Sequence, residues 1–342
     1  MGKIISKKGI FFTFVAITIM TVIALVFAPP LDTALLKDAQ PLHTRITSID
    51  NYINDLQEAY FETVLRATTH KAILSLIFYM NTTGFYLKDL DSTFRDVMMN
   101  GTIKHPPGSL THVRIDDITG KKIMENNTLL NWTSKITNVA FDTLNINASI
   151  NITNISVIQT KPWNIDSSIR INFTVKSDAA RWEKAAVITT TISVEGFHDP
   201  YYLVNTNGKY TNIIKKSTVA FDKWNISLVR EHLRNGTYVH WQASDAPSFL
   251  MRFNNSMDNS SCCGIESLVN PNLITPSDQR ESYLDYMFWS HVYNDVQNCT
   301  KLYNITTPST GTGLWDEFNY FKMDINHVTM YNITSKDAVR NC

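Results

Sequence analysis

The chain begins with an unbroken apolar run rather than a periodic pattern. Residues 9–28 contain no charged side chain, three lysines precede them, and Pro29-Pro30 follows. Twenty helical residues rise roughly 30 Å, the thickness of a bilayer core. The lysines favour a cytoplasmic N-terminus before any processing, which leaves residues 31–342 outside the cell. We therefore expect residues 1–30 to form a basic head and a hydrophobic membrane helix.

A cleaved secretory signal is the alternative interpretation of this segment. Val26-Phe27-Ala28 ends in the small residue that a signal peptidase requires. Pro29 would then be the first residue of the mature chain, which suits a peptidase poorly. The apolar region of a cleaved signal is also shorter, about 7–15 residues. We therefore expect the segment to be retained as an anchor.

A helical period follows the anchor. Between residues 42 and 80, apolar side chains recur at spacings of three, four and seven, with Asp50, Glu58 and Lys71 between them. This pattern is typical of a long amphipathic helix. Two interpretations stay open: the helix packs along its own globular domain, or it forms a stalk or an intersubunit contact.

From about residue 110 the period changes to two, which is typical of half-buried strands that pair in antiparallel order. A helical period returns at 221–233 and ends at Asn235-Gly236. The expected strands lie at 111–115, 147–158, 168–175, 186–194, 238–241, 248–253 and 321–333.

These patterns predict an α+β fold with three parts: an N-terminal hydrophobic helix, a long amphipathic helix, and an antiparallel β-rich, sandwich-like extracellular domain. The expected domains are residues 1–30, then a linker and the amphipathic helix at 31–84, then the β-rich domain at 85–342. The pattern changes again near residues 205–220, which marks a sub-boundary within the third part.

Acceptor triplets for N-glycosylation, Asn-x-Ser/Thr, are the most abundant motif. Fifteen occur, all after residue 80 and none with Pro in the middle, which exceeds what 31 Asn would give by chance. Such triplets receive glycans only outside the cytoplasm, so they agree with the expected topology. The acceptors are Asn81, Asn100, Asn126, Asn131, Asn147, Asn151, Asn154, Asn172, Asn225, Asn235, Asn254, Asn259, Asn298, Asn304 and Asn332.

Four cysteines lie near the C-terminus, at Cys262, Cys263, Cys299 and Cys342. An even number outside the cell indicates two disulfides. Adjacent cysteines rarely bond to each other, so we expect Cys262 and Cys263 to pair separately with the other two, in an order that stays open. The spacing lacks the CxxC pairs of a zinc site.

Charge and motifs exclude several classes of function. Lys plus Arg and Asp plus Glu both total 31, so no basic field attracts nucleic acid. No GxSxG, HExxH, P-loop, GxGxxG or EF-hand spacing occurs, and the nine histidines are scattered. We expect no enzyme activity, no cofactor and no metal. Covalent N-glycans are the expected modification.

The junction Lys8-Gly9-Ile10-Phe11 resembles the processing site of archaeal type IV prepilins. The resemblance implies cleavage after Gly9, so that Ile10 begins the mature chain. It also implies that residues 10–28 serve as a filament core or a membrane anchor. An ordinary signal anchor, in which Gly9 has no special role, is the alternative.

Three later stretches, together with the anchor, resemble a group of archaeal membrane-anchored surface proteins with pilin-like N-termini. They cover Val194–Pro200, Ala246–Phe253 and Gly264–Val269. The resemblance implies a component of the archaeal cell surface or of a pilus, and it carries no catalytic residue. On the residues alone, Asp199-Pro200 is expected to form a turn and Gly264 a loop hinge.

The sequence therefore predicts a glycosylated structural protein of the cell surface, a pilin-like filament subunit or a pilus-associated component. Residues 10–28 would contact a membrane or other copies of the chain, which allows a homopolymer. The alternative is a membrane-tethered adhesin or receptor, including a viral envelope-type glycoprotein, that does not polymerise.

Overall fold

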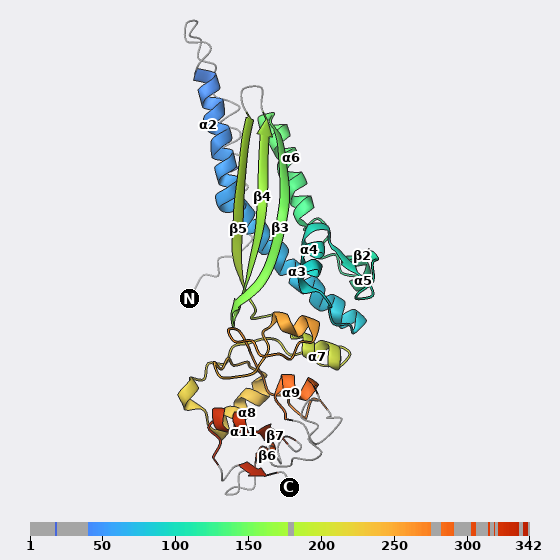
Figure 1. Cartoon of the computed structure of the whole chain (residues 1–342), viewed down its shortest axis with the longest axis vertical. Helices are drawn as coiled ribbons and strands as arrows, with labels where there is room; N and C mark the ends of the chain where they lie inside the picture. The colour runs from blue at the N-terminus through green and yellow to red at the C-terminus, as the bar shows by residue number, and fades with distance from the viewer. Residues whose placement is uncertain are drawn as a thin grey trace, which may run out of the picture. The chain divides into compact units, whose positions relative to one another are not determined.

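A computed structural model gives the fold of the chain (Figure 1). The chain divides into two units, residues 1–52 and 53–342, and each is described by itself. The residues that the structure describes are 18, 40–176, 181–274, 282–290, 302–305, 314, 318, 321–334 and 338–340.

In the first unit, residues 40–52 are helical and belong to α2 (Gln40–Asp55). The expected anchor at residues 9–28 lies outside the described residues, apart from Thr18. Within the described part of the chain, no helix combines the length and the apolar character that a bilayer crossing requires. The N-terminal hydrophobic helix of the predicted fold class therefore falls on residues that the structure does not describe.

In the second unit, helical structure continues through a short π-helical segment, η1 (Leu56–Tyr60), into α3 (Phe61–Thr83). Gly84 ends α3 with a left-handed φ of 69°, and its N–H donates to the Met80 carbonyl oxygen. Buried side chains occupy most of the circumference of α3, which contacts β4, β5, α4, α5, α6 and α7. Of the two interpretations of the predicted helix, α3 fits the one in which it packs along its own domain.

A three-stranded antiparallel meander is the main sheet, in the order β3-β4-β5. Its strands are β3 (Asn147–Lys161), β4 (Asn164–Lys176) and β5 (Arg181–Ser193). Alternate β4 residues from Ile165 to Val175 are buried, and each fully buried Ile contributes about 1.5–3 kcal/mol. Thr69 of α3 donates to the Ser167 hydroxyl of β4 at 3.0 Å, which satisfies two buried hydroxyls. The predicted strands at 147–158, 168–175 and 186–194 are confirmed.

Helices, not a second sheet, cover the inner face of the meander. α3 packs on β4 and β5, while α4 (Leu90–Asn100) and α6 (Leu129–Leu144) pack on β3 (Figure 1). The predicted sandwich is therefore wrong: the described strands form separate sheets of two, three and three strands. The apolar stripes of the helices supply the second layer that the sheet needs.

Between α4 and α6 the chain forms a small two-stranded sheet and a short helix. These elements are β1 (Thr102–Lys104), β2 (His112–Arg114) and α5 (Ile115–Thr119). The predicted strand at 111–115 is confirmed for its first part only, because Ile115 already begins α5. We call residues 61–193, from α3 to β5, the meander region.

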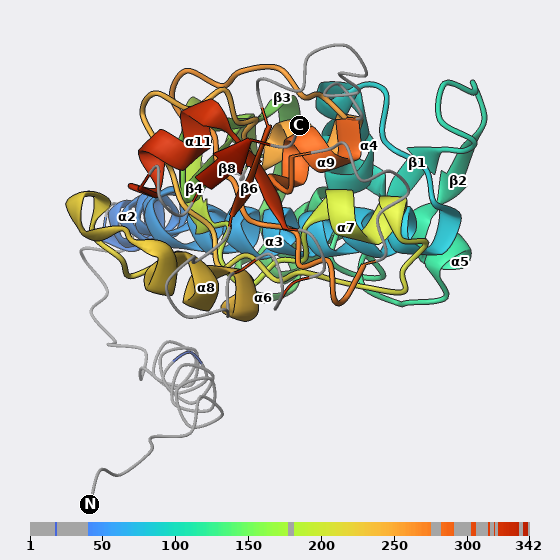
Figure 2. The ribbon, with the colours of Figure 1, turned by 90° about the horizontal axis from the view of Figure 1, so that it is seen from below.

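The remaining chain, residues 194–340, is built from short elements, and we call it the loop region. Figure 2 shows these elements from below, with α7 against α3 as the contacts also place it. They are α7 (Pro200–Asn205), η2 (Phe221–Lys223), α8 (Ile226–Asn235), η3 (Leu250–Asn254), α9 (Asp285–Ser290), β6 (Leu302–Ile305), β7 (Lys322–Asp324), α11 (Ile325–Met330) and β8 (Ala338–Arg340).

Two strand predictions in the loop region are wrong. The segment 248–253 is mostly the 3-10 turn η3, and the segment 321–333 contains only the short β7 before α11. Asp324 causes the second change, because its side chain accepts from the backbone N–H groups of Asn326 and His327 and so caps a helix. The predicted helix at 221–233 is confirmed as η2 and α8.

Candidate functional site

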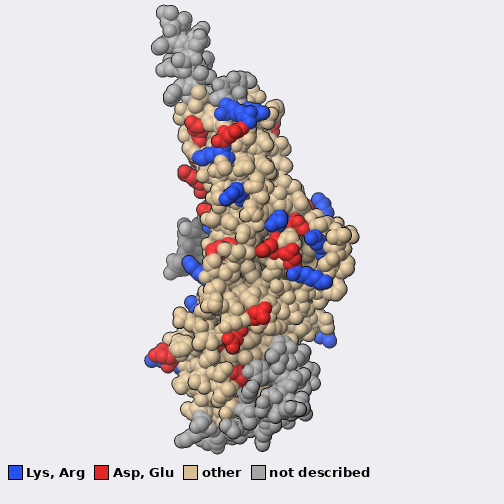
Figure 3. Space-filling view, viewed as in Figure 1, with Lys and Arg blue, Asp and Glu red and all other residues tan. Residues whose placement is uncertain are grey.

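The acceptor asparagines lie on the surface. Fourteen of the fifteen are described, and Asn298 is outside the described residues. Twelve of the fourteen are exposed, Asn131 and Asn304 are half-buried, and none is buried. Figure 3 shows Lys, Arg, Asp and Glu side chains in scattered groups on the face that it presents, with uncharged residues between them.

On the meander, four acceptors share the outer face of the sheet. Asn147, Asn151 and Asn172 have the exposed parity, and Asn151 pairs directly with Asn172 across the strands. Asn154 has the opposite parity in β3, but a register shift between Ile152 and Asn154 turns it outward as well. All four acceptors can therefore carry sugar without disturbing the buried face.

The expected processing site, Gly9 and Ile10, lies outside the described residues, so cleavage stays a prediction. The same holds for the contact expected through residues 10–28.

The cysteine pairing differs from the expectation. The structure joins Cys262 to Cys263, whereas separate partners were expected for each. A turn at residues 261–263 brings the adjacent sulfurs together, with Cys262 exposed and Cys263 buried. Cys299 and Cys342, the partners expected for Cys262 and Cys263, lie outside the described residues.

The centre of the loop region holds a buried guanidinium. Arg252, fully buried, pairs through Nη1 with Asp199 Oδ2 at 2.5 Å and with Asp285 Oδ2 at 2.6 Å. Its Nη2 donates to the Ile265 carbonyl oxygen, and its guanidinium lies over the Tyr201 ring at 4.7 Å. We call Arg252, Asp199 and Asp285, with the hydroxyl groups bound to them, the Arg252 cluster. These hydroxyl groups belong to Tyr238 and Ser267, and Tyr202 in turn bonds Ser267.

Burial and charge act against each other in the Arg252 cluster. Burial by itself disfavours the cation, but Asp199 and Asp285 outweigh it and raise the pKa of Arg252 well above its usual value. Burial raises the pKa of Asp285 to about 6, and the pairing with Arg252 opposes this rise. Two carboxylates share one cation here, and the negative charge of Asp199 adds to the rise in the pKa of Asp285.

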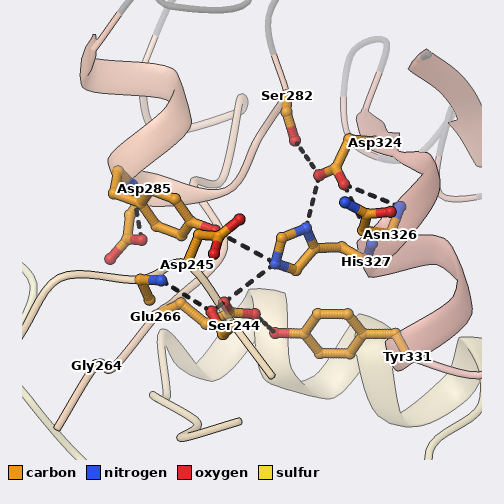
Figure 4. A network of polar contacts seen from close by, with 12 residues as sticks. Ser244, Asp245, Gly264, Glu266, Ser282, Asp285, Asp324, Asn326, His327 and Tyr331 are labelled. Carbon is orange, nitrogen blue, oxygen red and sulfur yellow. Dashed lines mark hydrogen bonds and ion pairs between the residues drawn. The ribbon is translucent and has the colours of Figure 1, made fainter. Parts of the chain in front are cut away.

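A second buried group surrounds an imidazole (Figure 4). His327 Nδ1 lies 2.7 Å from Asp324 Oδ2, and Nε2 lies 3.2 Å from Glu266 Oε2. We call His327, Asp324 and Glu266 the His327 cluster, together with the hydroxyl groups that donate to its carboxylates. Glu266 accepts from Ser244 at 2.7 Å and from Tyr331 at 3.2 Å, and Asp324 accepts from Ser282 at 3.2 Å.

Both ring nitrogens of His327 face carboxylates, so the ring is a doubly protonated cation. Burial alone would lower its pKa, but Glu266 and Asp324 raise the pKa of His327 to about 10. Burial would raise the pKa of Asp324, but the hydrogen bond from His327 lowers it. The neighbouring His232 behaves in the opposite way, because burial lowers its pKa to about 4 and keeps it neutral.

This geometry is that of a structural ion pair, not of a catalytic triad. A general base needs a ring nitrogen with a free lone pair next to a nucleophilic hydroxyl. Both nitrogens of His327 are occupied, and the serine hydroxyls bond to carboxylates instead. His327 is 3% exposed and Glu266 fully buried, so substrate has no access. In the described residues, no His, Cys, Asp and Glu side chains are grouped so as to hold a metal ion.

The sequence reasoning missed these buried charges, although signals for them exist. Asp199, Arg252 and Glu266 come from the three stretches Val194–Pro200, Ala246–Phe253 and Gly264–Val269, which the fold brings together. Asp199 does cap α7, as the expected turn former, because it accepts from the Tyr201 N–H at 2.9 Å. A single charge inside an apolar run, as in Phe249-Leu250-Met251-Arg252-Phe253, was the available signal for a buried pair.

Gly264 also has a different role from the expected hinge. It pairs with Ser248 in an isolated bridge, and a Cβ at this position would collide with the Ala246 carbonyl group. The missing side chain therefore lets two backbone segments approach closely beside the His327 cluster.

The chain matches no protein-family model, no curated protein and no solved structure.

Proposed function

We propose that this chain is a glycosylated protein of the cell surface, with residues 31–342 outside the cytoplasm, and that it acts by contact and not by catalysis. The observation that carries this proposal is the exposure of the acceptor asparagines. Twelve of fourteen are exposed and none is buried, although the fold buries many other polar residues. Their exposure leaves these twelve side chains accessible for the attachment of sugar.

The interior supports the second half of the proposal. The described histidine that sits closest to several acids, His327, is held as a cation between two of them. Buried pairs of this kind fix the arrangement of the segments that carry them, and they offer no base or nucleophile to a substrate.

Two forms of this function remain distinct. In the first, copies assemble into a pilin-like filament or attach to a pilus, with residues 10–28 in contact with a membrane or with other copies. In the second, a single tethered chain is an adhesin or receptor. A pocket lined by Trp163, Phe221 and Trp241 favours the second form, because a binding protein needs such a concave site.

The first test is the mass of the protein purified from its own cells, before and after chemical deglycosylation. We expect a loss of mass, with glycopeptides that contain the exposed acceptors such as Asn151 and Asn172. A mass that does not change on deglycosylation would contradict the proposal.

The second test separates the two forms. Electron microscopy and light scattering of the full-length protein should show single particles if the chain is an adhesin or receptor. Filaments with repeating heads would instead support the pilin-like form. Protection of residues 81–342 from protease added to whole cells would contradict both forms.

A further inference from the structure

A pocket of about 220 Å³ opens beside the turn that joins β3 to β4. Its walls come from that turn, from residues 216–224 before α8 and from residues 238–241 after it. These segments are far apart in sequence, so the fold and not a local motif builds the pocket. Five of its lining residues are Trp, Tyr or Phe: Trp163, Phe221, Trp224, Tyr238 and Trp241.

The aromatic rings combine a rigid base with an open face. Trp224 and Trp241 are 2% and 3% exposed and pack with ring centroids 5.9 Å apart. Phe221 rests on Trp241 at 4.9 Å, yet it is 71% exposed. A large apolar ring that is fixed in place and left open to solvent is typical of a binding surface.

Two polar side chains accompany the rings. Lys216 Nζ lies 5.7 Å from the centroid of the Trp163 ring and supplies hydrogen-bond donors. His240 Nδ1 lies 2.7 Å from the Gly264 carbonyl oxygen, and because a carbonyl only accepts, Nδ1 is the donor. In neutral His240 the other nitrogen, Nε2, is then an acceptor. The pocket therefore offers ring faces, donors and an acceptor together.

These features exclude two ligand classes. Lys216 already holds the cation position over Trp163, and no lining residue is acidic, so a cationic ligand would be repelled. A purely apolar ligand would bury Lys216 and His240 without hydrogen bonds, which is costly.

We propose that this pocket binds a pyranose sugar ring. One face of a pyranose presents C–H groups of slightly positive charge, which suit the negative faces of aromatic rings. Its hydroxyl groups donate and accept, which matches His240 Nε2 and the Lys216 ammonium group. An acidic sugar gains a further attraction from Lys216.

The sugar has two sources, another molecule or the protein's own glycans. Asn225 directly follows Trp224, the triplet at Asn235 ends just before Tyr238, and Asn332 Nδ2 donates to the Trp224 carbonyl oxygen at 3.1 Å. Three of the acceptor sites therefore adjoin the walls of the pocket. Binding of the protein's own glycans rests on the proposed function, whereas binding of a sugar from another molecule does not.

The test uses the full-length protein with methyl β-N-acetylglucosaminide, methyl α-mannoside and methyl β-glucuronide as probes. Tryptophan fluorescence and saturation-transfer NMR would follow each titration. We expect saturable binding of at least one sugar, with a Kd of about 1 mM for a ligand of this size. Phe221→Ala should weaken binding about tenfold, through the loss of one stacked ring.

Matched controls keep the test specific. Phe85→Ala removes another exposed phenyl ring, 46% exposed and away from the pocket, and should leave binding unchanged. Lys216→Ala should weaken binding of the glucuronide most, while Lys215→Ala, one residue away and outside the lining, should not. Thermal unfolding of each variant would confirm that it is folded.

A second arm distinguishes the sources. Ser227→Ala destroys the acceptor triplet but keeps Asn225, whose Oδ1 caps α8 by accepting from the N–H groups of residues 227 and 228. If free sugar binds only to this variant, the glycan on Asn225 fills the pocket of the wild type. If sugar binds to both proteins, the source is another molecule. The proposal is overturned if none of three proteins shows saturable binding: the wild type, Ser227→Ala and protein made without glycans. This outcome would count against the pocket whether or not the chain is glycosylated.

Discussion

In the meander region, side chains are buried at regular intervals along the sequence. In the loop region, buried charged side chains are held in ion pairs between distant segments. Along β4 every second residue from Ile165 to Val175 is buried, and α3 covers that face. In the loop region short segments converge on Arg252 and His327, each of which pairs with two buried carboxyl groups. Apolar burial tolerates gradual change, because each methylene adds a similar increment. A buried ion cluster does not, because the loss of one partner leaves an uncompensated charge.

The largest effect is expected at Arg252. Arg252→Met would leave Asp199 and Asp285 buried without a cation, so we expect a loss of about 3–5 kcal/mol in the free energy of unfolding. Adding Asp285→Asn to this variant removes one of the two uncompensated charges and should restore part of the loss. Chemical denaturation of the single and double variants measures both. Equal stability of wild type and Arg252→Met would contradict the role of the cluster.

The second effect depends on pH. The pKa of His327 is raised from 6.5 to about 10, so its stabilising contribution is fully present below pH 6.5 and is lost as the pH rises through 10. His327→Gln should therefore be much less stable than wild type near pH 6.5, and the difference should shrink toward pH 10. Denaturation curves at several pH values measure this difference.

Ile171→Ala serves as the matched control from the meander region. It removes a fully buried apolar side chain, at a cost of about 2–5 kcal/mol that should not change with pH.

In acid, wild type and His327→Gln should both lose stability. The pKa of His232 is lowered to about 4, so its contribution to the free energy of unfolding is lost as the pH falls from 6.5. A difference between wild type and His327→Gln that is the same at all pH values would mean that His327 is not a buried cation.

The smallest effect is expected at Gly264. Gly264→Ala places a methyl group against the Ala246 carbonyl group, and we expect a loss of about 1–3 kcal/mol from the forced backbone shift. Gly120→Ala is a useful comparison, because Gly120 ends α5 and has open space around it. Its left-handed φ of 66° is the only source of strain there. Thermal unfolding of the two variants side by side would separate close packing from backbone conformation.

The contrast also explains what the sequence could predict. Period-two patterns such as Ile169, Ile171 and Phe173 found the three meander strands, because a half-buried strand shows its buried face in its own residues. The helix before them was found for the same reason. The predicted sandwich was wrong, because the alternation of residues in a strand shows that one face is buried but not whether a sheet or a helix covers it. The apolar stripe of α6, which contacts β3, was the missed signal.

In the loop region, the partners of each residue lie far along the chain. Asp199 and Asp285 are brought together by Arg252, and His327 reaches Glu266 across 61 positions. No local period records such a pairing, so the Arg252 cluster and the His327 cluster were not predicted. The acceptor triplets, in contrast, could be found in the sequence because the motif consists of three consecutive residues.

The shared guanidinium of Arg252 sets a rule for how this chain can diverge over time. A sequence that loses Arg252 alone, or gains a third acid beside it, has an unpaired charge in the protein interior. Such sequences would be selected against because they are less stable. Asp199, Arg252 and Asp285 can therefore be replaced only as a set. Descendants of this chain should either inherit the trio intact or show all three positions turned apolar at once, even where the surface that carries the acceptor asparagines has changed completely.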